Sequence, residues 1–144
     1  MEVTDSMKRI QVVAGVIFRD DKASTHSDSN HILIARRADH LHQGGLWEFP
    51  GGKVERSETH HQSLVRELLE ELNITVISAS PMMQIRHDYT DKNITLDIWK
   101  VTKYEGNPEG LEGQEIRWVP MAELPNYDFP AANQPILKEL LGTQ

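Results

Sequence analysis

The sequence predicts an α/β fold in which two helices flank a mixed β-sheet. Three observations predict it: short apolar runs rich in β-branched residues recur along the chain, an amphipathic helical pattern lies near its middle, and a second one closes it. A helix with one apolar face must bury that face, and a sheet flanked by two such helices is the simplest arrangement that does so. Because we find no internal repeat or linker-like stretch, residues 1–144 are expected to form a single domain.

The expected strands are short apolar runs bounded by polar or glycine-rich stretches. Residues 11–18 and 31–36 are apolar and β-branched, and the polar stretch 19–30 between them is expected to be a hairpin-like loop. A second loop is expected at 38–46. The expected strands cover residues 11–18, 31–36, 47–49, 74–78, 82–89, 94–104 and 115–119.

A helix is expected over residues 58–72, after a loop that contains Gly51 and Gly52. Ser57 is a suitable N-cap, and Glu58 in the first turn would interact favourably with the helix dipole. At about 100° per residue, the last two turns separate an aliphatic side, which we expect to be buried, from a charged side. The aliphatic side carries Val65, Leu68, Leu69 and Leu72, and the charged side carries Arg66, Glu67, Glu70 and Glu71.

The charged side of this helix presents three carboxylates close to one another. Like charges so close repel, and a purely structural helix would gain more from Lys residues at i+4. Glutamates on a helix are most often a solvated face, but these follow two glycines, which allow the backbone to approach a ligand closely. Because hard divalent cations with oxygen ligands would relieve the repulsion, the segment indicates a metal site directed at phosphate.

The last expected element is an amphipathic helix over residues 131–141. Its apolar residues recur at helical spacing, so that one face would pack on the sheet. The residues expected to face inward are Ile136, Leu137, Leu140 and Leu141.

The composition argues against several classes of protein. The chain of 144 residues has no cysteine, which excludes disulfides and thiolate metal sites and is compatible with the cytoplasm. Residues 1–9 are too polar for a signal peptide, and no apolar run reaches membrane-spanning length. The net charge of -7 has the wrong sign for binding duplex DNA, whereas a small anionic substrate could bind through metal ions. The oligomeric state stays open, with a monomer slightly favoured.

The glycine loop and the helix together resemble a known motif. It is the Nudix box, G-x5-E-x7-R-E-U-x-E-E-x-G-U, where U is a bulky aliphatic residue. The matching residues are Gly52, Glu58, Arg66, Glu67, Leu68, Glu70, Glu71 and Ile74. The late glycine is Asn73 here, and because Asn is the next-best residue for a left-handed C-terminal conformation, the turn should be preserved. The resemblance to the Nudix family implies an α/β/α sandwich with a central mixed sheet.

The resemblance covers nearly the whole chain and narrows to the MutT branch of the family. Segments that resemble MutT proteins are 34–38, 47–53, 93–96, 111–114 and 129–135. This implies a hydrolase that converts nucleoside triphosphates, preferentially 8-oxo-dGTP, to the monophosphate and pyrophosphate, and so sanitises the nucleotide pool for DNA replication and repair. Alternatives are a Nudix hydrolase acting on CTP or another pyrimidine nucleotide, dihydroneopterin triphosphate or ADP-ribose, and a noncatalytic nucleotide-binding module, against which the intact acidic set argues.

The resemblance also implies a cofactor and a set of site residues. The metal is expected to be Mg²⁺, with Mn²⁺ as an alternative, held by Gly52, Glu67, Glu70, Glu71 and Glu112. The catalytic residues are expected to be Arg66, Glu67, Glu70, Glu71 and Glu112. Substrate is expected to contact Arg37, Gly51, Gly52, Lys53, Tyr89 and Asn133.

Several roles within the acidic set have alternatives. Glu112 is a metal ligand, a general base or an exposed loop acid, and Glu67 is the other candidate for the base. Arg66 is expected to organise the acidic cluster rather than to contact substrate. Glu58 either starts the helix or is a distant metal ligand. His60 and His61 have no metal-binding spacing and are expected at the surface.

The substrate contacts have alternatives as well. Arg37 is expected to meet the α-phosphate, a task that suits a guanidinium, whereas its neighbour Arg36 is expected to be structural or at the surface. Lys53 could contact phosphate or be solvated, and Tyr89 could stack on the base or pack in the core. Asn133 could read the guanine edge, because an amide carries both a donor and an acceptor, or it could cap the closing helix.

Overall fold

The computed structural model describes residues 9–19, 31–38 and 44–142. Residues 20–30 and 39–43, which make up most of the two predicted loops, lie outside the described residues. The elements in chain order are β1 (Arg9–Ile17), β2 (His31–Arg36), β3 (Trp47–Glu48), β4 (Gly51–Lys53), α1 (His60–Leu72), β5 (Thr75–Asp88), β6 (Asn93–Glu105), β7 (Ile116–Pro120), the 3₁₀ turns η2 (Met121–Asn126) and η3 (Ala131–Asn133), and α2 (Gln134–Leu141).

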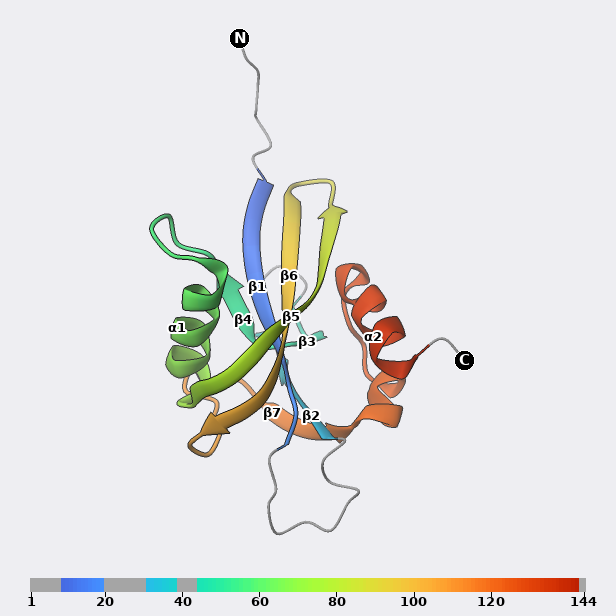
Figure 1. The fold of residues 1–144 in the computed structure, drawn as a ribbon. Helices are drawn as coiled ribbons and strands as arrows, with labels where there is room; N and C mark the ends of the chain where they lie inside the picture. Colours follow the sequence, from blue (N-terminus) through green and yellow to red (C-terminus); the bar gives the residue numbers. More distant parts are fainter. Residues whose placement is uncertain (1–8, 20–30, 39–43, 143–144) are drawn as a thin grey trace.

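The strands form two sheets, of which the larger is mixed. The four-stranded sheet has the order β4-β1-β6-β5, and the three-stranded sheet has the order β3-β2-β7. β1 and β6 run parallel, and the other pairings between described strands are antiparallel. A bridge between Phe18 and Ile32 links the end of β1 to β2. In Figure 1, α1 and α2 lie on opposite sides of the sheets, which confirms the predicted sandwich.

Each side of the sheets has its own hydrophobic core, because successive side chains of a strand point to opposite faces. On the α1 side, Leu64 and Leu68 pack in a cluster with Val13 of β1. On the α2 side, Ile136 packs in a cluster with the next residue of β1, Ala14. The chain therefore places α1 against one face of β1 and the C-terminal segment against the other.

The start of α1 corrects the sequence prediction. Thr59, not Ser57, is the N-cap: its hydroxyl accepts from the Gln62 N–H at 3.1 Å, and the Gln62 side chain accepts from the Thr59 N–H at 2.9 Å. This reciprocal capping box satisfies two otherwise free donors, so it determines where the helix begins. Glu58 consequently precedes the helix instead of lying in its first turn. Leu69 is also corrected, since it is 47% exposed.

The end of α1 confirms the prediction made for Asn73. This residue is in the left-handed conformation, with φ 61° and ψ 36°, and its N–H donates to the Leu69 carbonyl at 3.0 Å. It is the sole non-glycine residue with positive φ in the part of the chain that the structure describes. Asn therefore takes the place of the late glycine without loss of the turn.

His60, which was expected at the surface, connects the start of α1 to the sheet. Its Nδ1 lies 2.8 Å from Oδ2 of Asp97 in β6, and the same carboxylate oxygen accepts from the Trp99 indole N–H at 2.8 Å. Asp97 is only 5% exposed. A buried carboxylate needs such partners, so the pair gives the first residue of α1 a fixed contact on the sheet.

Two predicted boundaries in the second half of the chain differ from the structure. The strands predicted at 74–78 and 82–89 are one strand, β5, whose pairing with β6 shifts register around Pro81. Such irregularities accommodate a residue that has no N–H to donate. The helix predicted at 131–141 begins as η3 and continues as α2, where Ile136 and Leu137 are buried and Leu140 and Leu141 are partly buried. Of the helices in the described ranges, none combines the length and apolar character needed to cross a bilayer.

Candidate active site

Two adjoining cavities contain most of the predicted site residues. The apolar cavity, of about 230 Å³, is lined by Ile10, Val12, Val13, Ala14, Arg37, Glu48, Phe49, Gly51, Gly52, Lys53, Tyr89, Lys92, Ile94, Leu96, Pro130, Ala132 and Asn133. The charged cavity, of about 570 Å³, is lined by Ala35, Arg36, Arg37, Ala38, Glu48, Gly51, Glu71, Glu112, Gly113, Gln114 and Glu115. Arg37, Glu48 and Gly51 line both, so a ligand could extend from one cavity into the other.

The two glycines of β4 allow a close approach between this strand and its neighbours. A Cβ on Gly51 would overlap the backbone of Val13, which is close to it in the neighbouring strand. A Cβ on Gly52 would overlap the carboxylate of Glu67. Because β4 lacks side chains here, the Glu67 carboxylate from α1 lies directly on the strand backbone. The structure thus brings together Gly52 and Glu67, two residues of the predicted metal set.

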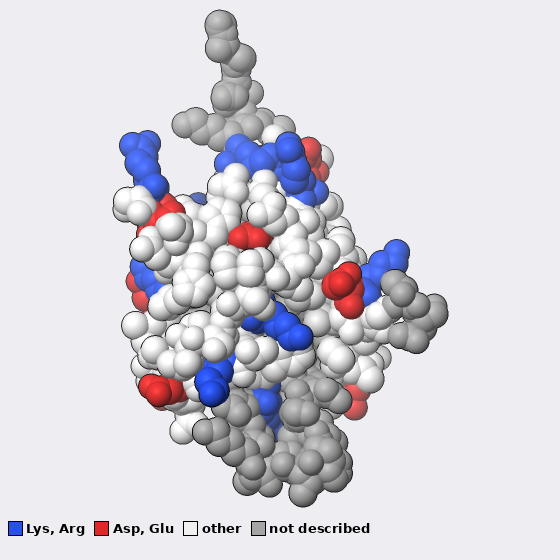
Figure 2. Space-filling model, viewed as in Figure 1, with Lys and Arg blue, Asp and Glu red and all other residues white. Residues whose placement is uncertain are grey.

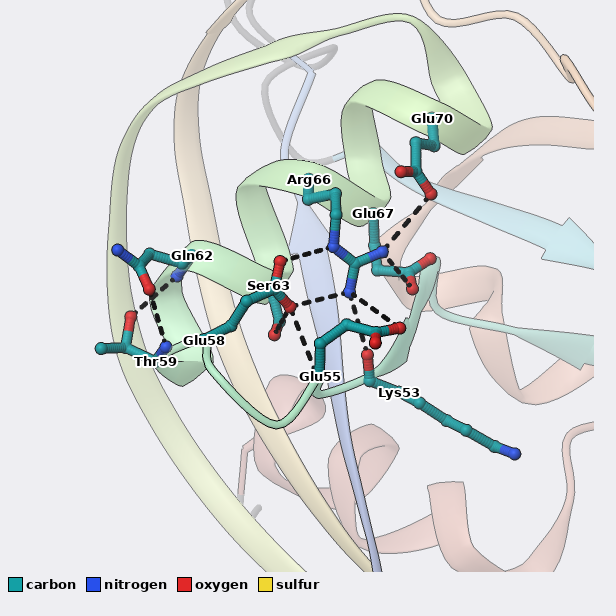
Figure 3. Close-up of polar contacts among 9 residues, drawn as sticks. All are labelled: Lys53, Glu55, Glu58, Thr59, Gln62, Ser63, Arg66, Glu67 and Glu70. Carbon is teal, nitrogen blue, oxygen red and sulfur yellow. Dashed lines mark hydrogen bonds and ion pairs between the residues drawn. The ribbon is translucent and has the colours of Figure 1, made fainter.

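Arg66 lies at the centre of the polar contacts on α1 (Figure 3). Its Nε and Nη2 donate to Glu58 at 2.6 and 2.9 Å, and its Nη1 donates to Glu67 at 3.0 Å and to Glu70 at 3.4 Å. Nη2 also donates to the backbone carbonyl of Lys53 at 3.2 Å. A guanidinium has donors in a planar fork, so one side chain can connect the loop, the helix and β4.

Glu58 has partners for its charge. Hydrogen bonds from Arg66, and then from the hydroxyl of Ser63, lower the pKa of Glu58 to about 2. The pKa of Arg66 is raised in turn, first by its hydrogen bonds with Glu58. The Glu58 carboxylate is therefore ionised and engaged with Arg66, as Figure 3 shows.

Glu71, at the other end of α1, is in the opposite situation. Burial raises the pKa of Glu71, and a hydrogen bond with Glu67 and the charges of Glu67, Glu112 and Glu48 raise it further. Burial also raises the pKa of Glu48, although the nearby Arg37 acts in the other direction. The charged cavity therefore gathers carboxylates that disfavour one another's ionised form.

The donor set fits a hard divalent cation. Its donors are carboxylate oxygens, which repel one another unless a positive charge is placed among them, and such oxygens are the ligands that Mg²⁺ prefers. As the described residues stand, no group of three or more acidic, histidine or cysteine side chains forms a ready-made cation site. Glu70 is directed at Arg66, and its side chain is 57% exposed.

Arg37 and Glu48 form an ion pair where the two cavities meet. The Arg37 Nη1 donates to the Glu48 carboxylate at 3.0 Å. Arg36, expected to be structural or at the surface, also lines the charged cavity, and its Nε donates to the Gly45 carbonyl at 3.2 Å. Glu48 was not among the predicted site residues. Its signals were its place in segment 47–53, which resembles MutT proteins, and its position two residues before Pro50. A glutamate in a strand could equally have faced solvent.

The remaining predicted substrate residues line the apolar cavity. Asn133 is 9% exposed, and although it occupies the N-cap position of α2, its side chain makes no capping hydrogen bond. The Tyr89 ring packs edge-on against His87, with ring centroids 4.4 Å apart. Lys53 lines this cavity too, and in Figure 3 its side chain points away from the Arg66 contacts.

Known proteins resemble this chain over nearly its whole length. The family described as "NUDIX domain" matches residues 23–139. The "8-oxo-dGTP diphosphatase" of Escherichia coli strain K12 is 40% identical over 134 residues, 93% of this chain and 98% of that protein. The "CTP pyrophosphohydrolase" of the same organism is 36% identical over 94% of each chain. A structure from a study of MutT from Aliivibrio salmonicida and Vibrio cholerae has 44% identity and a TM-score of 0.77, covering 93% of this chain and 98% of that one.

Proposed function

The chain belongs to the Nudix family, and we propose that it is a MutT-type nucleoside triphosphate pyrophosphohydrolase, with residues 1–144 as one catalytic domain. It hydrolyses 8-oxo-dGTP, and dGTP more slowly, to the nucleoside monophosphate and pyrophosphate. The 40% identity to an 8-oxo-dGTP diphosphatase supports this proposal. The observation that carries it is that an apolar cavity, suited to a nucleobase, adjoins a charged cavity, suited to phosphates. Arg37 and Gly51 line both cavities.

The metal in this proposal is Mg²⁺, with Mn²⁺ able to replace it. The residues that would hold it are Gly52, through its carbonyl, and Glu67, Glu70, Glu71 and Glu112. When bound, the ion supplies positive charge for the phosphates and lowers the pKa of a coordinated water. Arg66 holds Glu67 and Glu70 through hydrogen bonds, and so orients carboxylates without touching substrate. Glu67 and Glu112 remain the two candidates for the base.

The phosphates and the base are assigned to different residues. Arg37 binds the α-phosphate by exchanging its ion pair with Glu48 for a phosphate oxygen, because a guanidinium binds either anion well. Gly51, Gly52 and Lys53 line the same cavity as Arg37, so they are also placed to contact the phosphates. Asn133, which is 9% exposed, reads the guanine edge in the apolar cavity, and Tyr89 contributes to the lining of the same cavity.

The proposal also covers partners and location. The substrate is a small nucleotide and not duplex nucleic acid, because the net charge is -7 and the basic side chains on the face in Figure 2 form separated groups instead of a continuous stripe. An enzyme that sanitises the nucleotide pool for DNA replication and repair would act in the cytoplasm, as a monomer in this proposal.

A substrate panel tests the proposal directly. With Mg²⁺ present, kcat/KM should be highest for 8-oxo-dGTP, followed by dGTP, with CTP and ADP-ribose well below, and an excess of chelator should remove the activity. A higher kcat/KM for CTP would instead assign the chain to the function of its other E. coli relative.

The base-reading residue can be tested separately. Oxidation of guanine converts the N7 acceptor into an N–H donor, and a buried group left unpaired costs about 1–3 kcal/mol. Asn133→Ala should therefore reduce kcat/KM more for 8-oxo-dGTP than for dGTP. The matched control is Gln134→Ala, because Gln134 is the next residue but bonds to the Phe129 carbonyl and lies outside the lining of both cavities. An unchanged substrate ratio in Asn133→Ala would remove the basis for preferring the oxidised nucleotide.

A further inference from the structure

The loop that carries Glu112 is fastened to the end of α1. The last carbonyls of a helix have no partners within the helix, so something else must donate to them. Here the Glu109 N–H donates to the Leu72 carbonyl at 2.9 Å, and the Leu111 N–H donates to the Glu71 carbonyl at 3.0 Å. The loop backbone thus completes the helix end next to Glu71.

The side chain of Gln114 adds a link of a different kind. Its Nε2 donates to the Glu71 carbonyl at 3.2 Å, and its Oε1 accepts from the Glu112 N–H at 2.8 Å. A primary amide has both a donor and an acceptor, so one side chain can make both bonds. Gln114 therefore joins the backbone of Glu112 to the backbone of Glu71, two residues that lie far apart in the sequence.

The Gln114 bond acts directly on the Glu112 N–H, whereas the neighbouring Leu111 and Gly113 N–H groups donate to the Glu71 and Gly110 carbonyls. Glu112 is exposed and precedes Gly113, which has φ 81° and no heavy atom within 4 Å of the point where a Cβ would stand. Glycine restricts the backbone less than any other residue, so the Gln114 bond to the Glu112 N–H helps to determine where the Glu112 carboxylate lies. Both Glu112 and Glu71 line the charged cavity, and the charge of Glu112 contributes to the raised pKa of Glu71.

We propose that Gln114 is a positioning residue that sets where the Glu112 carboxylate stands relative to Glu71 across the charged cavity. The inference rests on the proposed function only in taking these two carboxylates as working groups of the reaction. Gln114 itself touches neither phosphate nor metal in this scheme, and it acts through the backbone of Glu112.

Amide hydrogen exchange in the metal-free protein tests the link without any substrate. Gln114→Met keeps the length of the side chain and removes both bonds, so exchange of the Glu112 amide should become about ten-fold faster or more. The matched control is Gln62→Ala, which removes an amide-to-backbone bond at the other end of α1 and should leave the Glu112 amide unchanged. If Gln114→Met folds poorly, Gln114→Ala provides the same comparison. Unchanged exchange at Glu112 in a folded variant overturns the proposal.

A kinetic double-mutant cycle tests whether the link matters for turnover. Gln114→Met should lower kcat by about ten-fold or more with KM within about two-fold, the size seen when groups that orient working residues are removed. In a Glu112→Gln background the same change should cost less than about two-fold, because the carboxylate that Gln114 positions is already gone. An equal loss in both backgrounds would mean a general structural role and would overturn the proposal. Because the exchange experiment needs no activity, it decides on the link even if the nucleotide panel fails.

Discussion

The loop before α1 and the last turn of α1 each hold a glutamate, and the pKa values of these two glutamates shift in opposite directions. Glu58, before the helix, accepts hydrogen bonds from Arg66 and Ser63, and its pKa falls to about 2. Glu71, in the last turn, is buried beside Glu67, Glu112 and Glu48, and its pKa rises. Both glutamates belong to the same sequence motif, yet one has counter-charges within the protein and the other has more like charges around it.

The direction of the pKa shift distinguishes glutamates that stabilise the fold from glutamates that are placed to bind a cation. A carboxylate with a lowered pKa adds to stability, whereas a cluster of carboxylates with raised pKa values costs stability unless a cation is bound. Carboxylates with strongly raised pKa values occur most often at functional sites. Glu67 contacts both groups of residues, because it accepts from Arg66 at 3.0 Å and is hydrogen-bonded to Glu71.

Replacing Glu71 should have the largest effect. Glu71→Gln keeps the shape of the side chain and removes the charge on which the cation depends, so turnover with Mg²⁺ should fall about 1,000-fold, or about 4 kcal/mol of transition-state stabilisation. The metal-free variant should be at least as stable as the unmodified protein, since Gln avoids the cost of burying an ionisable carboxyl beside other carboxylates. Steady-state kinetics and denaturant unfolding measure the two effects. Near-normal turnover in this variant, or in the unmodified protein with excess chelator, would contradict the proposal that the Glu71 carboxylate helps to bind a catalytic cation.

Replacing Arg66 should affect both ends of the helix at once. Arg66→Ala leaves Glu58 without its main partner and Glu67 without its orienting bond, so kcat should fall about 10- to 100-fold. Stability should fall by about 2 kcal/mol, because the side chain is only 26% exposed and its partners lose their hydrogen bonds. Arg66→Lys, which keeps the charge but not the planar fork, should recover part of the stability and little of the turnover. A variant with normal kcat would show that the two ends work independently.

The smallest expected effect concerns acid stability at Glu58. Its folded pKa of about 2 lies below its ordinary value of 4.5, so its contribution to stability is fully present above pH 4.5 and is lost as the pH falls toward 2. In Glu58→Gln, the free energy of unfolding should therefore depend less steeply on pH in this window. Glu55→Gln is the matched control, because Glu55 is 64% exposed, lies 3.9 Å from Arg66 and should keep the original slope. Equal slopes in the unmodified protein and Glu58→Gln would contradict the assignment.

Local patterns made much of this molecule predictable. The body of α1, its acidic side and the left-handed Asn73 follow from helical periodicity and turn chemistry over neighbouring residues. The helix start was missed because Ser57 and Thr59 are both good N-caps, and only the matching Gln62 side chain decides between them. The strands predicted at 74–78 and 82–89 leave a gap that contains Pro81, whereas pairing with β6 makes the whole stretch one strand.

Contacts between distant segments could not be predicted in this way. Glu48 could be assigned to the two cavities only when β3 was placed beside Arg37. The link from Gln114 to the Glu71 carbonyl depends on how the Glu112 loop returns to the end of α1, and no local pattern contains that information. For the same reason, the sequence did not show that the strands divide into two sheets.

The parallel pairing of β1 with β6 has a consequence for how the chain is made. Arg9 pairs with Asn93 and Ile17 with Val101, so β1 lacks this partner until β6 has left the ribosome. Until then, β4 is the one sheet partner of β1 among the described strands, and the other edge of β1 offers N–H and C=O groups to other chains. Long-range pairing of this kind slows folding and prolongs that exposure. The apolar side of α1 packs in one cluster with Val13 of β1 and Val101 of β6, so the core beneath the acidic set is complete only after β6 has been synthesised.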